Sequence, residues 1–327
     1  MHRKRDGTNL MISVIVPARN ESKIIRQCLS ALRAQSLPAD QFEIVVVDNG
    51  STDDTVEIAQ QFTDRVYSFP GVAVGKLRNS GAKLAQGDVL AFIDADCLAS
   101  EHWLEGARDG LADGGVAVGN KYDRPADTRW IEALWLGSVS PGRLQTQELW
   151  SGNLVVDRAS FDACGGFDET LVSYEDVYLS AGLAVRGELY FDDRVRVVHV
   201  GGPATLMEFA SQQLWHGFEE WTLFARGIKR DTFVPTMMCL VGYALLIFAA
   251  FFPTPASWGA FALGIMLIAG ASLWRLRIHL YSHPQASWRT VMRLALLNFV
   301  SLSARALAVV IRAFRLDWSG RKKSVTV

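Results

Sequence analysis

The sequence predicts an α/β domain built on a parallel sheet, followed by apolar helices. Short apolar runs alternate with amphipathic stretches over the first two thirds of the chain, and Val89–Ile93 is the clearest run. Such uninterrupted runs are typical of strands buried on both faces. Polar residues follow the runs, and long uncharged stretches begin only after about Arg230. We therefore predict one domain over residues 1–230 and a membrane region over residues 231–327.

The composition limits the partners that the chain could bind. Its 327 residues include 33 Lys and Arg and 34 Asp and Glu, a net charge of −1, so no basic excess indicates a nucleic acid. The four cysteines are scattered without a C-x-x-C pair, which is typical of a reduced compartment. The first ten residues are basic but lack the apolar core of a signal peptide. We expect the catalytic domain to stay in the cytoplasm.

The first two predicted strands, residues 11–16 and 42–47, end in polar loops. Ligands of open α/β sheets bind at the carboxyl ends of the strands. Asp48 follows the second strand and could accept hydrogen bonds from the NH groups of a ligand, for example the imide of uracil. A role as a turn residue beside Gly50 is the alternative.

A basic pair follows the third predicted strand, residues 65–69. Lys76 and Arg78 lie beside two glycines and before an Ala-rich helix, so both could approach a diphosphate. For Lys76 alone, a solvated basic turn is the alternative.

Two carboxylates follow the apolar run Val89–Ile93. Asp94 and Asp96 stand one residue apart at its carboxyl end and offer hard oxygen ligands. This donor set suits Mg²⁺ or Mn²⁺, and the phosphates of a substrate would supply further ligands. An isolated pair could instead be a helix cap and a loop residue, but the buried strand before it favours a metal site.

Four segments of the chain occur in the order and spacing of a known family. They read VPARNES, VVVDNGSTD, RNSGAKLAQGD and FIDAD, and they resemble family 2 glycosyltransferases, whose fold is the GT-A nucleotide-sugar-binding domain. The resemblance covers residues 12–227. It implies that Asp48 contacts the nucleotide base, that Asp96 holds a divalent metal on the diphosphate, and that Asp94 lies on the ribose or in the metal shell. The residues implied to line the nucleotide pocket are Pro17, Ala18, Asn20 and Glu21.

The later part of this domain resembles the acceptor side of the family. Gly152 and Asn153 would lie near the transferred sugar. Glu175 and Asp176 precede an apolar-periodic helix, a position that the helix dipole favours for acidic residues without any catalytic role. The family carries its catalytic base in such a pair, so the resemblance implies that Asp176 deprotonates the acceptor hydroxyl while Glu175 helps to hold it.

Two further positions bear on the type of transferase. His199 ends a predicted strand over residues 195–200, where some relatives use a His as a metal ligand or phosphate contact; a structural His is the alternative. Family members that polymerise processively carry Gln-x-x-Arg-Trp downstream. From Gln212, this chain has Trp215 and His216 in place of the Arg and Trp. The departure indicates transfer of single sugars.

A bulky apolar face occurs at helical spacing in the middle of the chain. Its members are Trp130, Ile131, Leu134 and Trp135. The face could pack inside the protein, or it could lie against the membrane or a lipid-linked acceptor, since Trp favours the membrane interface. The sequence supports the two interpretations equally.

The last hundred residues contain three apolar stretches. Residues 233–252 and 256–274 are long enough to span a membrane, and the basic stretch after them indicates the cytoplasmic side. The third stretch, residues 294–311, contains Arg305 and precedes a basic tail that reaches Lys323. We predict an amphipathic or re-entrant segment at the cytoplasmic face, and a third span is the alternative.

The expected protein is therefore a metal-dependent inverting glycosyltransferase of the inner membrane. It would move one sugar from a nucleoside diphosphate donor, UDP being favoured by the family, to a lipid-linked or membrane-proximal acceptor. It looks like bacterial enzymes of exopolysaccharide synthesis, including succinoglycan-type glucosyltransferases. The alternative is a polyprenyl-phosphate sugar synthase, in which the acceptor is the lipid phosphate itself. The sequence does not identify the sugar or the acceptor.

Overall fold

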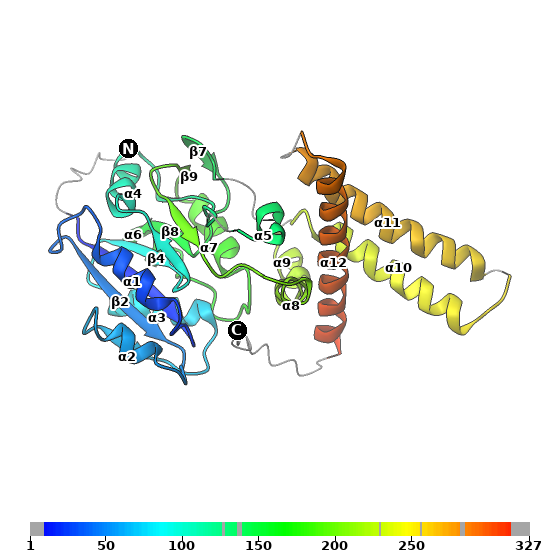
Figure 1. The fold of residues 1–327 in the computed structure, drawn as a ribbon, viewed down its shortest axis with the longest axis horizontal. Coiled ribbons are helices and arrows are strands. Elements are labelled where there is room, and N and C mark those ends of the chain that lie inside the picture. Colours follow the sequence, from blue (N-terminus) through cyan, green and yellow to red (C-terminus); the bar gives the residue numbers. More distant parts are fainter. Residues whose placement is uncertain are drawn as a thin grey trace. The chain divides into compact units, whose positions relative to one another are not determined.

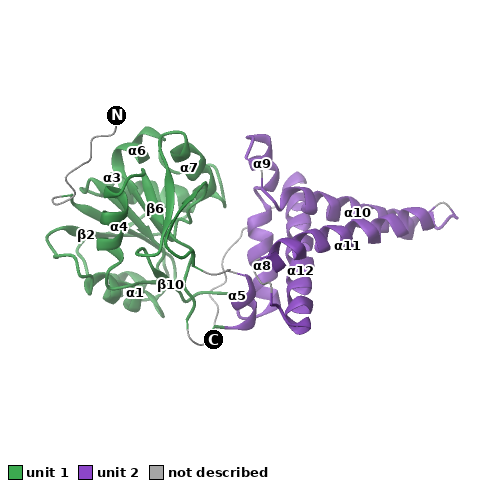
Figure 2. Ribbon diagram, turned by 90° about the horizontal axis from the view of Figure 1, so that it is seen from above, with its two compact units in different colours: residues 1–128, 138–202 green, residues 129–137, 203–327 purple. Residues whose placement is uncertain are grey.

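The computed structural model describes residues 10–125, 128–135, 139–228, 230–255, 257–281 and 285–314. The chain divides into two compact units, shown in green and purple in Figure 2. The first comprises residues 1–128 and 138–202, and the second comprises residues 129–137 and 203–327. The division by contacts falls after residue 202, whereas the sequence placed a domain boundary after residue 230; that boundary stays a prediction.

The first unit is built on an eight-stranded sheet in the order β3-β2-β1-β4-β8-β6-β9-β7 (Figure 1). The first four strands along the chain are β1 (Ile12–Ala18), β2 (Phe42–Asp48), β3 (Val66–Ser68) and β4 (Val89–Ile93). They are parallel, as the sequence predicts. The remaining strands of this sheet are β6 (Ala117–Gly119), β7 (Arg143–Thr146), β8 (Asn153–Asp157) and β9 (Leu189–Asp192).

The sheet is mixed because β8 enters it antiparallel beside β4, with Ile93 opposite Asn153. The carboxyl end of β4 and the start of β8 therefore lie at the same edge of the sheet. A second sheet pairs β5 (Cys97–Ala99) antiparallel with β10 (Val197–His199) and places His199 opposite Cys97. These two pairings bring chain segments far apart in sequence next to Asp94 and Asp96.

Helices cover both faces of the large sheet, which explains its uninterrupted apolar strands. On one face α1 (Ile25–Arg33), α2 (Thr55–Ala59) and α4 (Trp103–Ala112) share a core with alternate residues of β1. On the other face, α3 (Val74–Leu84), α6 (Arg158–Ala163) and α7 (Glu175–Ala184) pack on the residues between them, such as Ile15. Successive residues of a strand face opposite sides of the sheet, so a strand covered on both sides is apolar along most of its length.

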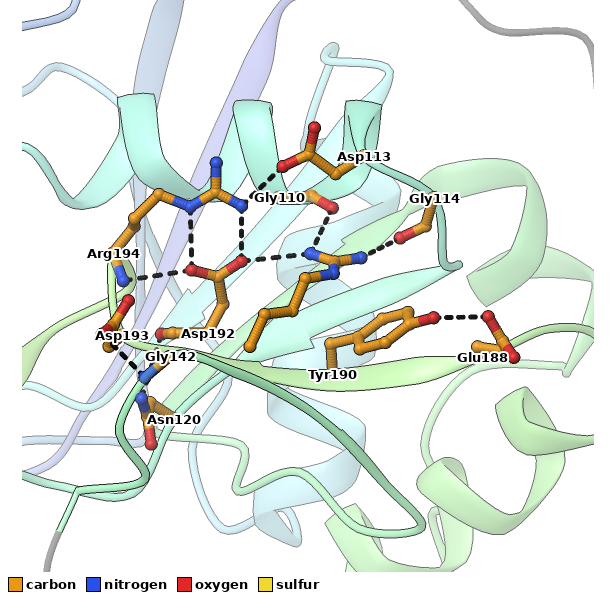
Figure 3. Close-up of polar contacts among 11 residues, drawn as sticks. Gly110, Asp113, Gly114, Asn120, Gly142, Glu188, Tyr190, Asp192, Asp193 and Arg194 are labelled. Carbon is orange, nitrogen blue, oxygen red and sulfur yellow. Dashed lines mark hydrogen bonds and ion pairs between the residues drawn. The ribbon is translucent and has the colours of Figure 1, made fainter.

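A network of charged residues fixes the far end of the sheet to α4 (Figure 3). Asp192 is 1% exposed and accepts hydrogen bonds from Arg143 at 3.0 Å and from Arg194 at 2.9 and 2.7 Å. Arg143 also donates to Gly110 O at 2.9 Å and lies 3.7 Å from the ring centroid of Tyr190. Burial raises the pKa of Asp192, but the hydrogen bonds and charges of the two arginines outweigh it and lower the pKa. The network is a structural one.

The second unit is helical. It consists of α5 (Trp130–Trp135), α8 (Leu206–Gly217), α9 (Glu220–Ala225), α10 (Phe233–Phe251), α11 (Ser257–Tyr281) and α12 (Trp288–Ala313). The last three are long and apolar enough to cross a membrane, by length and composition. Figure 1 shows α10 and α11 side by side as a hairpin, while α12 runs across the hairpin next to α8.

Helix α12 buries several polar residues and exposes several large apolar ones. Arg305 is 5% exposed and donates to Glu220 of α9 at 2.6 Å and to Gln213 of α8 at 2.8 Å. The large apolar residues exposed on α12 and at its C-cap recur at helical spacing and form a stripe. This stripe consists of Trp288, Met292, Leu296, Phe299, Leu307 and Phe314. A bulky apolar outer surface suits contact with lipid, whether the helix spans or lies in the interface.

The bulky face predicted around Trp130 packs within the second unit. Ile131 is 1% exposed in a cluster with Phe209 and Leu297. The Trp135 ring lies edge-on to Phe209 at 4.8 Å and to His279 at 5.0 Å. Of the two interpretations left open, the structure shows packing within the protein.

Candidate active site

The loops after β1 and β2 interlock at the carboxyl edge of the sheet. Asn20 N donates to Ser51 Oγ at 2.9 Å, and Asn20 Oδ1 accepts from Thr52 N at 2.8 Å. Glu21 N donates to Thr55 Oγ1 at 2.8 Å. Asn20 has a φ of 55°, a left-handed conformation that a non-glycine residue adopts at a cost. The predicted pocket residues Pro17, Ala18, Asn20 and Glu21 therefore lie on a fixed edge, and their contact with a nucleotide stays a prediction.

Asp48 is held by its own loop. The residue is 3% exposed and accepts from Gly50 N at 2.9 Å, from Ser51 N at 3.1 Å and from Ser68 Oγ at 3.2 Å. Gly50 has a φ of 73°, which the tight turn requires. The structure thus shows the turn role of Asp48, and its predicted contact with the base stays a prediction.

Arg78 joins two carboxylates at this site. Helix α3 begins at Val74, so Lys76 and Arg78 stand on the helix. The sequence placed them before it. Lys76 is exposed. Arg78 is 3% exposed and donates to Asp94 Oδ1 and to Glu175 Oε1, both at 2.6 Å. This pairing directs both terminal nitrogens of Arg78 to carboxylates. The predicted approach of Arg78 to a diphosphate stays a prediction.

Glu175 and Asp176 open α7 after a strained residue, Tyr174, whose φ is 60°. Asp176 Oδ2 accepts from Ser151 N at 3.3 Å, and Ser151 Oγ lies 3.4 Å from Glu175 Oε1. Burial raises the pKa of Glu175 more than Arg78 lowers it. Burial, and then the charge of Glu148, raise the pKa of Asp176. A raised carboxylate pKa suits a residue that must take up a proton.

Asp96 and His199 face each other where β5 meets β10. Asp96 Oδ2 lies 3.6 Å from His199 Nε2, and the two side chains are 16% and 15% exposed. Among the residues that the structure describes, no three His, Cys, Asp or Glu side chains form a metal-binding group. A carboxylate and an imidazole nevertheless suit a divalent cation that takes its further ligands from a diphosphate. The residues present therefore fit such a cation.

The predicted sugar-side residues Gly152 and Asn153 differ in their roles. Asn153 is 0% exposed and braces the core: its Oδ1 accepts from Trp103 Nε1 at 2.9 Å, and its Nδ2 donates to the carbonyls of Asn120 and Val195. Gly152 lies directly against the candidate site, because a Cβ on it would stand 2.6 Å from Asp94 Oδ2. Contact of either residue with a sugar stays a prediction.

Sequence reasoning missed two aromatic residues at this site. Tyr122 stacks on His199 with ring centroids 5.1 Å apart, and Trp150 lies 5.1 Å from Tyr122. Burial, and then the charge of Asp94, raise the pKa of Tyr122. The sequence offered no signal for Tyr122, because it stands outside all the recognised motifs. Trp150 directly precedes the Ser151–Gly152 segment, which is the one hint that the sequence gives.

The site therefore gathers an acidic group around one guanidinium. Asp94 and Glu175 bind Arg78, Asp96 faces His199, and Asp176 lies beside Glu175. Such a group can hold a cation together with an anionic ligand at one end and accept a proton at the other.

Comparison with known sequences finds similarity to glycosyltransferases. Residues 13–161 match the family model described as "Glycosyl transferase family 2". Glycosyltransferase AglE of Haloferax volcanii is 39% identical over 100 residues, which are 29% of this chain and 33% of that relative. Validoxylamine A glucosyltransferase of Streptomyces hygroscopicus subsp. jinggangensis is 27% identical over 219 residues, 54% of this chain and 52% of the relative. The chain thus matches between a third and about half of the length of these relatives.

A solved structure supports the fold. The mannosyltransferase PcManGT of Pyrobaculum calidifontis, in complex with GDP-Man and Mn²⁺, superimposes with a TM-score of 0.58 at 18% identity, covering 95% of this chain and 90% of that one. At this identity the likeness establishes the fold alone. The chain thus carries a domain that matches the family 2 glycosyltransferase model over residues 13–161 and has the GT-A fold, followed by three apolar helices that could anchor it in a membrane.

Proposed function

We propose that this chain is an inverting glycosyltransferase that moves a single sugar from a nucleoside diphosphate sugar to a hydroxyl of a lipid-linked or membrane-proximal acceptor. The observation that carries the proposal is the placement of Asp176 and the Asp96–His199 pair on either side of the Asp94–Arg78–Glu175 bridge. The match of residues 13–161 to the family model and the glycosyltransferase relatives support it.

In this proposal Asp176 acts as the general base. Its carboxylate takes the proton of the acceptor hydroxyl while the oxygen attacks the anomeric carbon, and the bond from that carbon to the diphosphate oxygen breaks on the opposite face. Ser151 N holds the carboxylate from one side, and Glu175, fixed by Arg78, supports the start of α7. Attack opposite the leaving group inverts the anomeric configuration.

Asp96 and His199, with Asp94 beside them, would hold the divalent cation, Mg²⁺ or Mn²⁺. When bound, such a cation neutralises charge on the departing nucleoside diphosphate. The mannosyltransferase of similar fold was solved with Mn²⁺ and GDP-Man, which supports a metal and a nucleotide sugar here. A uridine nucleotide remains our expectation from the family.

Asp176→Asn tests the role of the base. The substitution keeps size and most hydrogen bonding but removes the basic carboxylate. A positioned base is worth about 10²- to 10⁴-fold in rate, so turnover should fall by that order while donor affinity stays unchanged. Turnover is measured with a panel of nucleotide sugars and a bacterial lipid extract, with products identified by mass spectrometry. Donor affinity is measured by calorimetry.

Asp157→Asn is the matched control, because Asp157 caps α6 and Asn caps helices equally well. Near-normal turnover of Asp176→Asn would remove Asp176 as the base. It would favour the polyprenyl-phosphate sugar synthase, because a lipid phosphate is already ionised. Loss of donor binding would instead show that the acidic pair only shapes the pocket.

We further propose that α10 and α11 anchor the protein in the inner membrane with the catalytic unit in the cytoplasm. The basic residues at the end of α11 include Arg277, and the positive-inside rule favours the cytoplasm for them. The exposed apolar stripe and buried Arg305 of α12 support an interfacial helix. Reporter fusions after Arg277 and after Lys323, which lies outside the described residues, should both read cytoplasmic. A periplasmic signal at Lys323 would show that α12 spans.

A further inference from the structure

Tyr122 is fixed at the site by the backbone on which it stands. The segment after β6 runs beside β10: Asp123 N donates to Val197 O at 2.8 Å, and His199 N donates to Asp123 O at 3.2 Å. Tyr122 and His199 are therefore held on adjacent strands of backbone. Their side chains meet as neighbours, and their register does not depend on a ligand.

The ring of Tyr122 is also packed in place. Its centroid lies 5.1 Å from the His199 ring at an interplanar angle of 22°, a stacked contact. The second neighbour is Trp150, whose ring centroid lies 5.1 Å from that of Tyr122 at an interplanar angle of 51°. Two aromatic neighbours leave the phenol few alternative rotamers, so its hydroxyl has a defined position.

The hydroxyl lies against Gly152. A Cβ built on Gly152 would stand 2.2 Å from Tyr122 Oη and 2.6 Å from Asp94 Oδ2. Tyr122 Oη and Asp94 Oδ2 therefore both lie against Gly152. Within the described part of the chain, no residue forms a hydrogen bond with this hydroxyl. A half-buried phenol held without a hydrogen-bond partner is a donor ready for a ligand.

The position of the Tyr122 hydroxyl determines which part of a bound ligand it can contact. In a direct displacement the transferred sugar lies between the leaving diphosphate and the general base. Tyr122 stacks on the His of the Asp96–His199 pair at the diphosphate end. Trp150, its other neighbour, directly precedes Ser151, whose N–H holds Asp176 at the base end. Tyr122 thus lies between the two ends.

We propose that the Tyr122 hydroxyl donates a hydrogen bond to a hydroxyl or ring oxygen of the sugar being transferred, and that His199 and Trp150 position it for this contact. The inference rests on the proposed function and adds a donor-sugar contact to it. It makes Tyr122 a determinant of which sugar is accepted, because a buried hydrogen bond discriminates strongly between hydroxyl configurations.

Tyr122→Phe tests this contact, because it keeps the ring and its two aromatic neighbours. Calorimetry in the presence of Mn²⁺ compares nucleotide sugars (UDP-glucose, UDP-N-acetylglucosamine and GDP-mannose) with UDP and GDP. The variant should bind the accepted nucleotide sugar about 3- to 10-fold more weakly, the value of one hydrogen bond. Its affinity for the matching nucleoside diphosphate should not change.

Tyr190→Phe is the matched control, because the Tyr190 hydroxyl pairs with Glu188 in the network of Figure 3, away from the candidate site. Gly152→Ala gives a second variant: its methyl group would crowd both Tyr122 Oη and Asp94 Oδ2, so it should weaken the binding of the sugar nucleotide as well. Equal losses for both ligands in Tyr122→Phe, or no loss for either, would overturn the proposal. If the unmodified protein bound no nucleotide sugar, the proposed function itself would fail and the sugar contact with it.

Discussion

Two places in the first unit differ in how many arginines each buried carboxylate contacts. In the network of Figure 3, two guanidinium groups, those of Arg143 and Arg194, converge on the one carboxylate of Asp192. At the candidate site the ratio is reversed, because one guanidinium, that of Arg78, is shared by Asp94 and Glu175. The two arginines lower the pKa of Asp192, whereas burial raises the pKa of Glu175 more than Arg78 lowers it.

This difference separates a structural network from a site built for chemistry. A carboxylate with two arginines has its burial compensated, so it stabilises the fold and needs no further partner. Carboxylates that outnumber their arginine oppose one another, and their charge is relieved by a bound cation or by a proton. We therefore expect substitutions in the first network to change stability and substitutions in the second to change activity.

We expect the largest contrast when an Asp→Asn substitution is made once in the candidate site and once in the network around Asp192. Asp96→Asn should reduce transfer by at least about 10²- to 10³-fold at any Mg²⁺ or Mn²⁺ level, the order found when one electrostatic stabiliser is removed. Asp192→Asn should leave turnover unchanged below its melting temperature. Turnover and thermal unfolding of both variants provide the measurement. Full activity of Asp96→Asn, or of the unmodified protein in excess chelator, would contradict the metal assignment.

Arg78→Met should destabilise the protein by about 3–5 kcal/mol, since removing one partner of a buried pair leaves an uncompensated charge. Adding Glu175→Gln should recover part of this loss, because it removes the carboxylate that lost its partner. Denaturant unfolding of the single and double variants measures both effects. An unchanged stability in Arg78→Met would show that the bridge between Asp94 and Glu175 is not maintained in solution.

Asp192→Asn should lower the free energy of unfolding by roughly 1.5–3 kcal/mol, the range for hydrogen bonds to a charged group. Because the folded pKa of Asp192 is lowered, its stabilisation is present above the ordinary pKa of 3.8 and is lost as the pH falls through the folded value. The difference between variant and unmodified protein should thus shrink in acid. Thermal unfolding at several pH values tests this, and a constant difference would count against the network.

The smallest expected effect is on the pH profile. Asp176 acts as a base only when ionised, and burial raises its pKa above the ordinary value of 3.8. The ratio kcat/KM should therefore fall with decreasing pH, about tenfold per unit below a midpoint that lies above 3.8. Nucleoside diphosphate affinity over the same range separates this effect from loss of metal. A midpoint at or below the ordinary value would contradict a buried base.

Local pattern was enough to predict part of the fold. Strands β1 and β2 are mostly apolar and β4 is apolar at every position because helices cover both faces, and this property is visible in the sequence itself. The polar residues after each strand follow from the rule that parallel sheets bind ligands at that edge. The antiparallel entry of β8 could not be predicted, since its pairing with β4 depends on residues about sixty positions apart.

The sequence by itself determined which residue types gather after the strands and which stretches are apolar enough to enter a membrane. Only the tertiary structure decided that Arg78 binds Asp94 and Glu175, which lie 16 and 97 positions away, and that Tyr122 reaches Gly152. It likewise decided that the polar side of α12 faces α8 and α9. The physical reason is that the charge balance and pKa of a buried group depend on distances in space, which chain spacing does not fix.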